Sequence, residues 1–94
     1  MKVDIIVTRH PALREFLVRK GIADWDTPVV AHASPANVMG KHVAGVLPLF
    51  LAAIAASLTN VELSLPLEMR GKELTVSNME QYCVGIRTYL VRSI

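Results

Sequence analysis

The residues best suited to chemistry stand together in one short segment, where Thr8, Arg9 and His10 come directly before Pro11. They follow a β-branched run and precede a stretch with the spacing of a helix. A hydroxyl, a guanidinium and an imidazole at the start of a helix supply donors where backbone N–H groups and the helix dipole already favour an anion. The segment predicts a phosphate-binding turn. The simpler alternative is that Thr8 caps the helix while Arg9 and His10 are solvated.

Further candidates follow the other expected strands. Ser34 can donate to a phosphate, although an N-cap is the commoner role for such a serine. Leu47 and Pro48 carry no reactive group but can form the floor on which a base or a ribose packs. His32 and His42 are weaker candidates, because the first is expected inside an apolar strand and the second at the start of one.

Two cations, Arg70 and Lys72, flank Gly71 after the fourth expected strand. Cations beside a flexible residue can clamp a phosphodiester, whereas a charged, solvent-exposed turn is the commoner meaning of such a run. Lys41 is open to the same two interpretations.

Hydrophobic periodicity predicts the elements that would position these residues. We expect four strands, at residues 3–8, 28–33, 42–47 and 60–65, the last at or near an edge of the sheet. We expect helices from Pro11 to about Lys20, from Ser34 to Met39 as a short turn, and from Pro48 to about Ser57. A capping box of Ser77 and Glu80 predicts a final helix that turns its apolar residues to the core, namely Met79, Tyr82, Cys83, Ile86, Tyr89 and Leu90.

This alternation predicts a single α/β domain over residues 1–94, with a three-layer, Rossmann-like architecture around a mainly parallel four-stranded sheet. Ligands of such sheets bind beyond the carboxyl ends of the strands. The chain has no internal repeat, linker or low-complexity segment.

Composition narrows the classes of function. Hydrophobic residues make up 52% of 94 residues, and so small a domain has little interior, which favours a homodimer. The net charge of +2 is too small to indicate binding to long nucleic acids. The apolar run from Val43 to Leu58 is too short and too interrupted to span a bilayer, and Asp4 stands where a signal peptide would be apolar, so we expect a cytoplasmic protein without membrane contact.

Several familiar sites are absent from the sequence. Cys83 is the only cysteine, which excludes an internal disulfide and a multi-cysteine metal site. The glycine-rich dinucleotide and P-loop motifs, the zinc-protease motif and the serine-hydrolase elbow are not found. The three histidines lack a metal-ligand spacing, and we expect neither a metal nor a cofactor.

Three motifs in order resemble those of one small family: V-T-R-H-P from Val7 to Pro11, G-V-L-P from Gly45 to Pro48, and L-P-L-E-M-R-G-K-E-L-T from Leu65 to Thr75. The chain resembles the accessory family of type III CRISPR loci whose members begin with a strand followed by T-R-H-P and are regarded as ring nucleases. The resemblance implies a CARF-like fold and a homodimer that binds and linearises a cyclic oligoadenylate second messenger, cyclic tetra-adenylate above all, to switch off antiviral signalling. By position, Thr8, Arg9, His10, Ser34 and Arg70 would line the pocket.

A mechanism for that substrate needs no metal. A ribose 2′-hydroxyl can attack its own 3′ phosphodiester and leave a 2′,3′-cyclic phosphate, provided that the protein holds the attacking and leaving oxygens in line. Arg9 or Arg70 would stabilise the charge that grows on the phosphorane oxygens, and His10 is the candidate general acid for the departing 5′ oxygen.

Three rival interpretations stay open. The I-I-V-T-R-H segment echoes histidine phosphatases of the phosphoglycerate-mutase type, but Pro11 replaces their glycine and the chain is short for that fold. A module that binds a cyclic nucleotide as a sensor or sponge would use the same pocket without turnover. A dimerisation domain without a ligand is the third.

Overall fold

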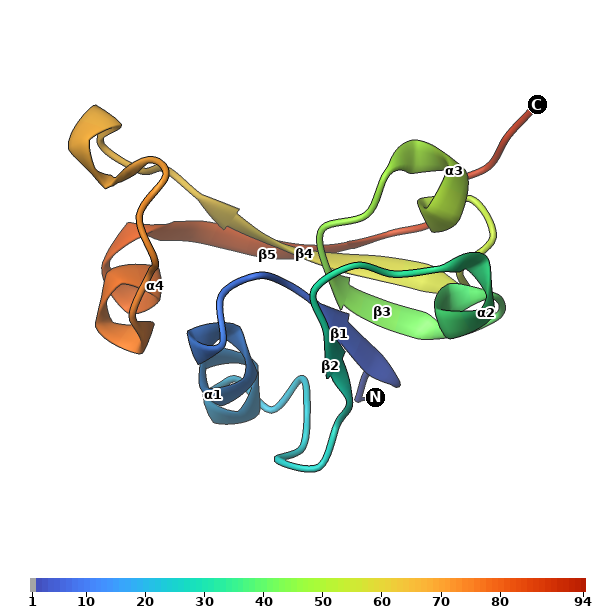
Figure 1. The fold of residues 1–94 in the computed structure, drawn as a ribbon, viewed down its shortest axis with the longest axis horizontal. Coiled ribbons are helices and arrows are strands. Elements are labelled where there is room, and N and C mark those ends of the chain that lie inside the picture. The colour runs from blue at the N-terminus through green and yellow to red at the C-terminus, as the bar shows by residue number, and fades with distance from the viewer. Residues whose placement is uncertain (1) are drawn as a thin grey trace.

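A five-stranded sheet runs through the middle of the molecule in the order β2, β1, β3, β4, β5 (Figure 1). The computed structural model describes residues 2–94. The strands β1 to β4 are parallel to one another, and β5 is antiparallel to β4. The strands are β1 (Ile5–Val7), β2 (Val29–Val30), β3 (His42–Gly45), β4 (Ser57–Leu63) and β5 (Cys83–Tyr89). The expected Rossmann-like α/β class is confirmed, with one strand more than the four expected.

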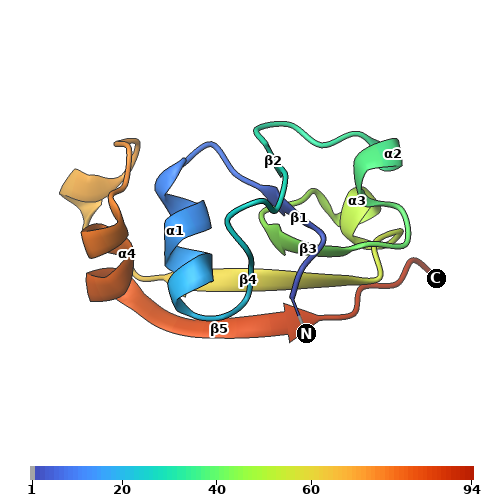
Figure 2. The ribbon, with the colours of Figure 1, turned by 90° about the horizontal axis from the view of Figure 1, so that it is seen from below.

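Helices cover both faces of the sheet, which gives the three layers that the alternation of elements predicts (Figures 1 and 2). One face holds α1 (Ala12–Arg19) and α4 (Val76–Tyr82), and the other holds α2 (Pro35–Val38) and α3 (Leu49–Ala52). Successive side chains of β1 point to opposite faces of the sheet, so the core has two parts. Ile6 packs under α1 and α4, whereas Ile5 and Val7 pack under α2 and α3.

The first helix forms as its sequence predicts. Pro11 stands at the N-cap of α1, where its fixed φ suits a helix start. Leu13, Phe16 and Leu17 are buried against the sheet at the i, i+3, i+4 spacing. Gly21 follows the helix with a φ of +75°, a conformation that favours glycine at a helix end. A short loop then returns the chain to β2.

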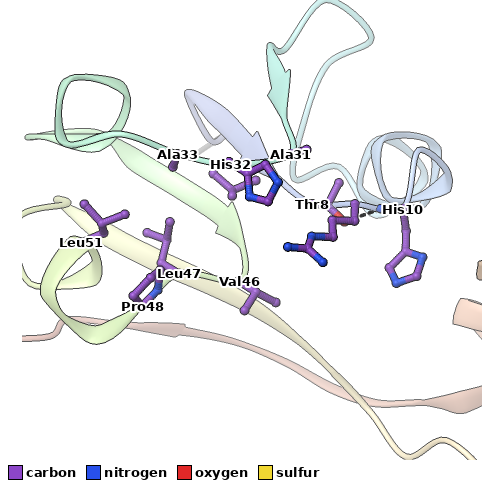
Figure 3. Close-up of a pocket in the computed structure, with 11 residues that line it drawn as sticks. Thr8, His10, Ala31, His32, Ala33, Val46, Leu47, Pro48 and Leu51 are labelled. Carbon is purple, nitrogen blue, oxygen red and sulfur yellow. Dashed lines mark hydrogen bonds between the residues drawn. The ribbon is translucent and has the colours of Figure 1, made fainter. Parts of the chain in front are cut away.

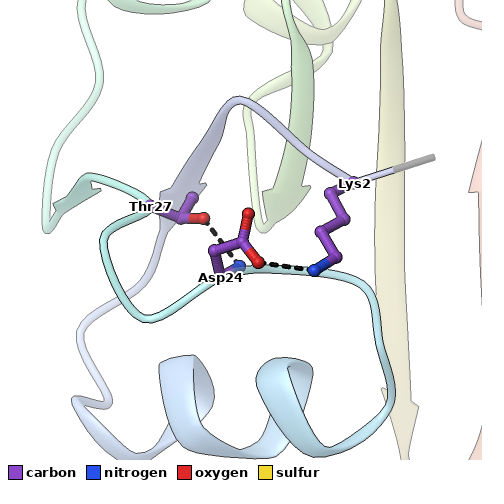
Figure 4. Close-up of polar contacts among 3 residues, drawn as sticks. All are labelled: Lys2, Asp24 and Thr27. Carbon is purple, nitrogen blue, oxygen red and sulfur yellow. Dashed lines mark hydrogen bonds and ion pairs between the residues drawn. The ribbon is translucent and has the colours of Figure 1, made fainter.

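Polar contacts fix the return loop beside the start of β1 (Figure 4). The ammonium of Lys2 lies 2.5 Å from an oxygen of Asp24, and the backbone N–H of Asp24 donates to the hydroxyl of buried Thr27 at 2.9 Å. These contacts lie at the amino ends of the parallel strands, and they anchor the loop that leads into β2.

Several elements are shorter than expected: β1 covers Ile5–Val7 rather than residues 3–8, and β3 covers His42–Gly45 rather than residues 42–47. Two further differences change where residues near the site lie. The second strand covers only Val29–Val30 rather than residues 28–33, so His32 lies in the loop after it and not inside a strand. The helix after Pro48 covers only Leu49–Ala52, because β4 already begins at Ser57, where it pairs with His42 of β3. The strand expected at residues 60–65 therefore occupies residues 57–63, and it lies second from the edge.

The expected final helix is half helix and half strand. Thr75 rather than Ser77 is its N-cap, with the N–H of Asn78 donating to the Thr75 hydroxyl at 3.1 Å. The helix ends at Tyr82, and Cys83–Tyr89 forms β5. This segment contains Gly85 together with valine, isoleucine, threonine and tyrosine, which suit a strand better than a helix, and it pairs with the otherwise open edge of β4.

No helix within residues 2–94 is long and apolar enough to span a bilayer.

Candidate functional site

The register of the parallel strands brings three loops to one edge of the sheet. Val7, the last residue of β1, pairs with Val30 at the end of β2 and with Gly45 at the end of β3. The residues that follow these three positions therefore leave the sheet side by side. This edge is the one at which parallel α/β sheets bind their ligands.

The close approach of β1 and β3 at this edge requires glycine at position 45. Gly45 has a φ of +123°, and a Cβ atom there would lie 1.9 Å from the carbonyl oxygen of Val7. The same carbonyl accepts the N–H of Val46 at 3.2 Å. Gly45 thus lets the chain turn tightly from β3 into the loop that leads to Pro48.

A cavity of about 450 Å³ opens between the three loops (Figure 3). Its polar residues come from the β1 and β2 loops, and its apolar floor comes mainly from the β3 loop and α3. The lining residues are Val7, Thr8, Arg9, His10, Ala31, His32, Ala33, Val46, Leu47, Pro48 and Leu51. One guanidinium and two imidazoles line the cavity, and no carboxylate does, so its electrostatics favour an anion.

The turn after β1 is held by its own side chains. The N–H of His10 donates to the hydroxyl of Thr8 at 3.0 Å, and the N–H of Thr8 donates to the carbonyl of Val30. Arg9 is exposed between them and has no ion pair with a carboxylate within residues 2–94. The sequence-based expectation places these three residues together, and the structure does the same.

His10 is fixed by a contact with a distant part of the chain. The backbone N–H of Leu74 lies 3.3 Å from Nδ1 of His10, where it can donate a hydrogen bond. A backbone N–H can donate only to an unprotonated ring nitrogen, so this contact requires a neutral imidazole with its proton on Nε2. In this arrangement His10 presents a hydrogen-bond donor rather than a charge.

His32 takes a more central place than its sequence context suggests. His32 lies among the labelled lining residues of Figure 3, near Ala31, whereas His10 lies at one end of the lining. The imidazole of His32 is exposed. Sequence reasoning underrated this residue because it extended the second strand to Ala33; the end of β2 at Val30 is the signal that places His32 on the rim.

Two predicted site residues have other roles in this structure. Ser34 does not line the cavity; its N–H and its hydroxyl lie 2.8 and 3.0 Å from Oδ1 of Asn37, which makes it the N-cap of α2. Lys41 immediately precedes β3 and therefore lies at the opposite edge of the sheet from the cavity. The floor residues Leu47 and Pro48, in contrast, line the cavity as expected.

Arg70 and Lys72 do not line the cavity either, because β4 continues far beyond the rim. Ala44 pairs with Thr59, so Leu65 lies about five residues past the level of Gly45, or about 16 Å at about 3.3 Å per residue. The chain then forms the 3-10 turn η1 (Leu67–Met69) and returns to α4 beside α1 (Figure 2). Both cations are exposed in this returning segment.

The other reactive side chains at the sheet do not form a comparable site. His42 Nδ1 lies 2.7 Å from the hydroxyl of Ser57, its cross-strand partner, at the edge opposite the cavity. Within residues 2–94, no group of three or more histidine, cysteine, aspartate or glutamate side chains is placed to hold a metal ion.

Comparison with known proteins identifies the family of the chain. The family described as "Putative CRISPR-associated protein (Cas_VVA1548)" matches residues 5–92, which include the cavity and both halves of the sheet. Neither a curated protein nor a solved structure was found to be significantly similar. Because the match spans almost the entire sequence, the chain belongs to this family of CRISPR-associated proteins.

Proposed function

We propose that this protein is a cytoplasmic ring nuclease, which binds and linearises a cyclic oligoadenylate to switch off type III CRISPR antiviral signalling. Its preferred substrate is cyclic tetra-adenylate. The family assignment supports the CRISPR context. The observation that carries the proposal is the cavity at the carboxyl ends of β1, β2 and β3, which combines an apolar floor with cationic and imidazole groups and no carboxylate.

The cavity fits the chemistry of an adenylate ring. Leu47, Pro48 and Leu51 offer an apolar surface on which an adenine or a ribose can pack, and Arg9 is available for a phosphodiester. The volume of about 450 Å³ is in the range of small-ligand sites, and it suits part of a ring rather than the entire ring.

The proposed reaction uses the nucleophile that the substrate supplies. The 2′-oxygen attacks the adjacent phosphorus, the bond from phosphorus to the 5′ oxygen breaks, and the products are a 2′,3′-cyclic phosphate and a 5′-hydroxyl. Arg9 stabilises the negative charge that grows on the non-bridging oxygens, and the cavity walls hold the ribose in line. The proton of the attacking 2′-hydroxyl passes to water, and a proton must reach the departing 5′ oxygen.

Two imidazoles can serve this step, and they are held differently. His10 was the candidate acid from its position in the sequence, but its Nδ1 contact with Leu74 favours a neutral ring. We therefore assign proton donation to His32, whose exposed ring lies among the lining residues, and we assign His10 a hydrogen bond from Nε2–H to a phosphate oxygen. Arg70 and Lys72 have no part in this scheme.

A two-fold homodimer is part of the proposal, because a ring of repeated nucleotides can meet the same residues from two sides. Val46 lines the cavity and is 75% exposed, and the neighbouring side chains of Leu49 and Phe50 are 77% and 67% exposed. An apolar surface that continues from the cavity rim onto α3 is a suitable contact for a second copy. Sedimentation should show a dimer, and Phe50→Glu should shift it towards the monomer; a monomeric wild-type protein at micromolar concentration would remove this part.

The function is tested by incubating the protein with cyclic oligoadenylates of different ring sizes in the presence of a chelator, with the products separated by chromatography. We expect cyclic tetra-adenylate to yield linear fragments that end in 2′,3′-cyclic phosphates. Tight binding with recovery of the intact ring would instead establish a sponge. No binding to any ring would reject the proposed function.

A further inference from the structure

A second hollow, of about 310 Å³, adjoins the cavity described above. It lies where the β1 loop and the start of α1 face β2, and it shares Thr8, Arg9 and Ala31 with the larger cavity. Its full lining is Thr8, Arg9, Pro11, Arg14, Val29 and Ala31. Arg9 therefore borders two neighbouring spaces. We call the smaller one the Arg14 hollow.

Arg14 lines this hollow and carries an unsatisfied donor. Its Nε is buried, and within residues 2–94 it has no hydrogen-bond partner. Buried donors in folded proteins are nearly always paired, because burying one without an acceptor is costly. Arg19, on the same helix, shows the contrast: it is exposed and pairs with Glu15 at 2.6 Å. The nearby carboxylate thus serves Arg19, and Nε of Arg14 lacks an acceptor.

The charges of the residues around the Arg14 hollow indicate which kind of acceptor would bind there. Two guanidinium groups line it, with the hydroxyl of Thr8, and no carboxylate does. The remaining lining residues, Pro11, Val29 and Ala31, are apolar and place no competing side-chain acceptor beside the two arginines. A guanidinium fork matches two oxygens of a phosphate group.

We propose that the Arg14 hollow is a phosphate subsite, in which Arg14 and Arg9 together bind a phosphate group. The identification of this phosphate as a second phosphodiester of the cyclic ligand rests on the proposed function. On that basis Arg9 lies between two consecutive phosphates of the ring, and Arg14 sets the register in which the scissile one enters the larger cavity.

The direct test observes the Nε–H signals of the arginine side chains by ¹H–¹⁵N NMR, with the Arg14 signal assigned from its absence in Arg14→Lys. Two probes are titrated into the wild-type protein: inorganic phosphate, and a cyclic tetra-adenylate with 2′-fluoro riboses, which lacks the attacking hydroxyl. We expect the Arg14 signal to move with both, while the Arg19 signal stays in place.

A matched pair of variants measures the strength of the contact. Arg14→Gln and Arg19→Gln remove one positive charge from the same helix. We expect Arg14→Gln to weaken binding of the fluorinated ring about tenfold and to reduce the slope of log affinity against log salt by about 0.7, as for one lost phosphate contact. Arg19→Gln should leave that slope unchanged, and thermal unfolding confirms that both variants fold.

The possible results separate this inference from the proposed function. If phosphate moves the Arg14 signal while no cyclic oligoadenylate binds, the subsite stands and the ring nuclease is rejected. If the ring binds and is cleaved while the Arg14 signal stays in place with both probes, the subsite is rejected and the function stands. If neither probe moves the signal and no ring binds, both are rejected.

Discussion

The two halves of the sheet differ in where their strands end relative to the rim of the cavity. In the half formed by β1, β2 and β3, which we call the parallel half, short strands end level with one another, and the buried Val7 and Gly45 pair at the rim. The other half, which we call the antiparallel ribbon, consists of β4, β5 and the segment of residues 64–82 that joins them. Both strands run for seven residues and carry the chain past that rim.

This difference explains why the residues that line the cavity all come from the parallel half. Parallel strands that end in register bring three separate loops together, so the lining of the cavity comes from residues 7–51 alone. The antiparallel ribbon instead carries Arg70 and Lys72 away from the cavity. Within residues 2–94, the ribbon contacts a cavity residue through the hydrogen bond from the Leu74 N–H to His10. Under the proposed function, the parallel half binds the ligand and the ribbon supports the β1 loop through this contact.

The largest effect is expected at His32 of the parallel half. If His32 protonates the leaving oxygen, His32→Ala should keep the affinity for the ring and slow single-turnover cleavage about 10²- to 10⁴-fold. His10→Ala should lower affinity and cleavage together, because a ground-state hydrogen bond is lost. The opposite pattern, with the selective loss of cleavage in His10→Ala, would return the acid to His10.

The next largest effect is on the free energy of unfolding, and it differs between two glycines that both have a positive φ. Gly45→Ala should lower the free energy of unfolding by about 3 kcal/mol, because its Cβ would overlap the Val7 carbonyl at the rim. Gly71→Ala in the ribbon has a φ of +79° but open space around it, so strain alone should cost about 1–2 kcal/mol. Denaturant unfolding measures both, and equal losses would contradict the tight approach of β1 and β3.

The third prediction compares the arginines of the two halves. Arg9→Ala should weaken binding of the fluorinated ring by about 1.5–3 kcal/mol, the range for a lost charge-assisted hydrogen bond. Arg70→Ala and Lys72→Ala should change it by less than about 0.5 kcal/mol, since both lie outside the cavity. A loss at Arg70 as large as that at Arg9 would show that the ribbon contributes to the site.

The smallest effect is confined to the ribbon. The hydroxyl of Tyr89 donates to Glu62 at 3.0 Å, and this hydrogen bond, with partial burial and the carboxylate charge, raises the pKa of Tyr89 above its usual value. Its contribution to folding is therefore present at lower pH and is lost as the pH rises through this raised pKa. Glu62→Gln should lower the Tyr89 pKa in a tyrosinate absorbance titration and leave cleavage unchanged; an unchanged titration would contradict the contact.

The sequence predicts the parallel half better than the ribbon, and the reason is physical. Thr8, Arg9 and His10 follow a buried strand and precede a proline, so both their element and their edge could be inferred. The tight approach at Gly45 depends on contact with Val7, which is 38 positions away, and spacing alone gives no sign of it.

The ribbon and the Arg14 hollow depend on contacts between segments that are distant in the sequence. Met79, Tyr82, Cys83 and Ile86 fit a helical period, yet the open edge of β4 draws the chain into a strand from Cys83. Arg70 could be placed at the rim only on the assumption that β4 ends there. The sequence does not single out Arg14, because a cation on an amphipathic helix is ordinarily solvated and only the tertiary packing buries its Nε.

The most direct test of the division between the two halves is the mapping of backbone amide signals by NMR while the 2′-fluoro cyclic tetra-adenylate is added. The account predicts the largest shifts in the three loops at residues 8–10, 31–33 and 46–48, with little change along β5 and around Arg70 and Lys72. Shifts concentrated at residues 65–75 and along β5, with the three loops unchanged, would contradict the placement of the site in the parallel half.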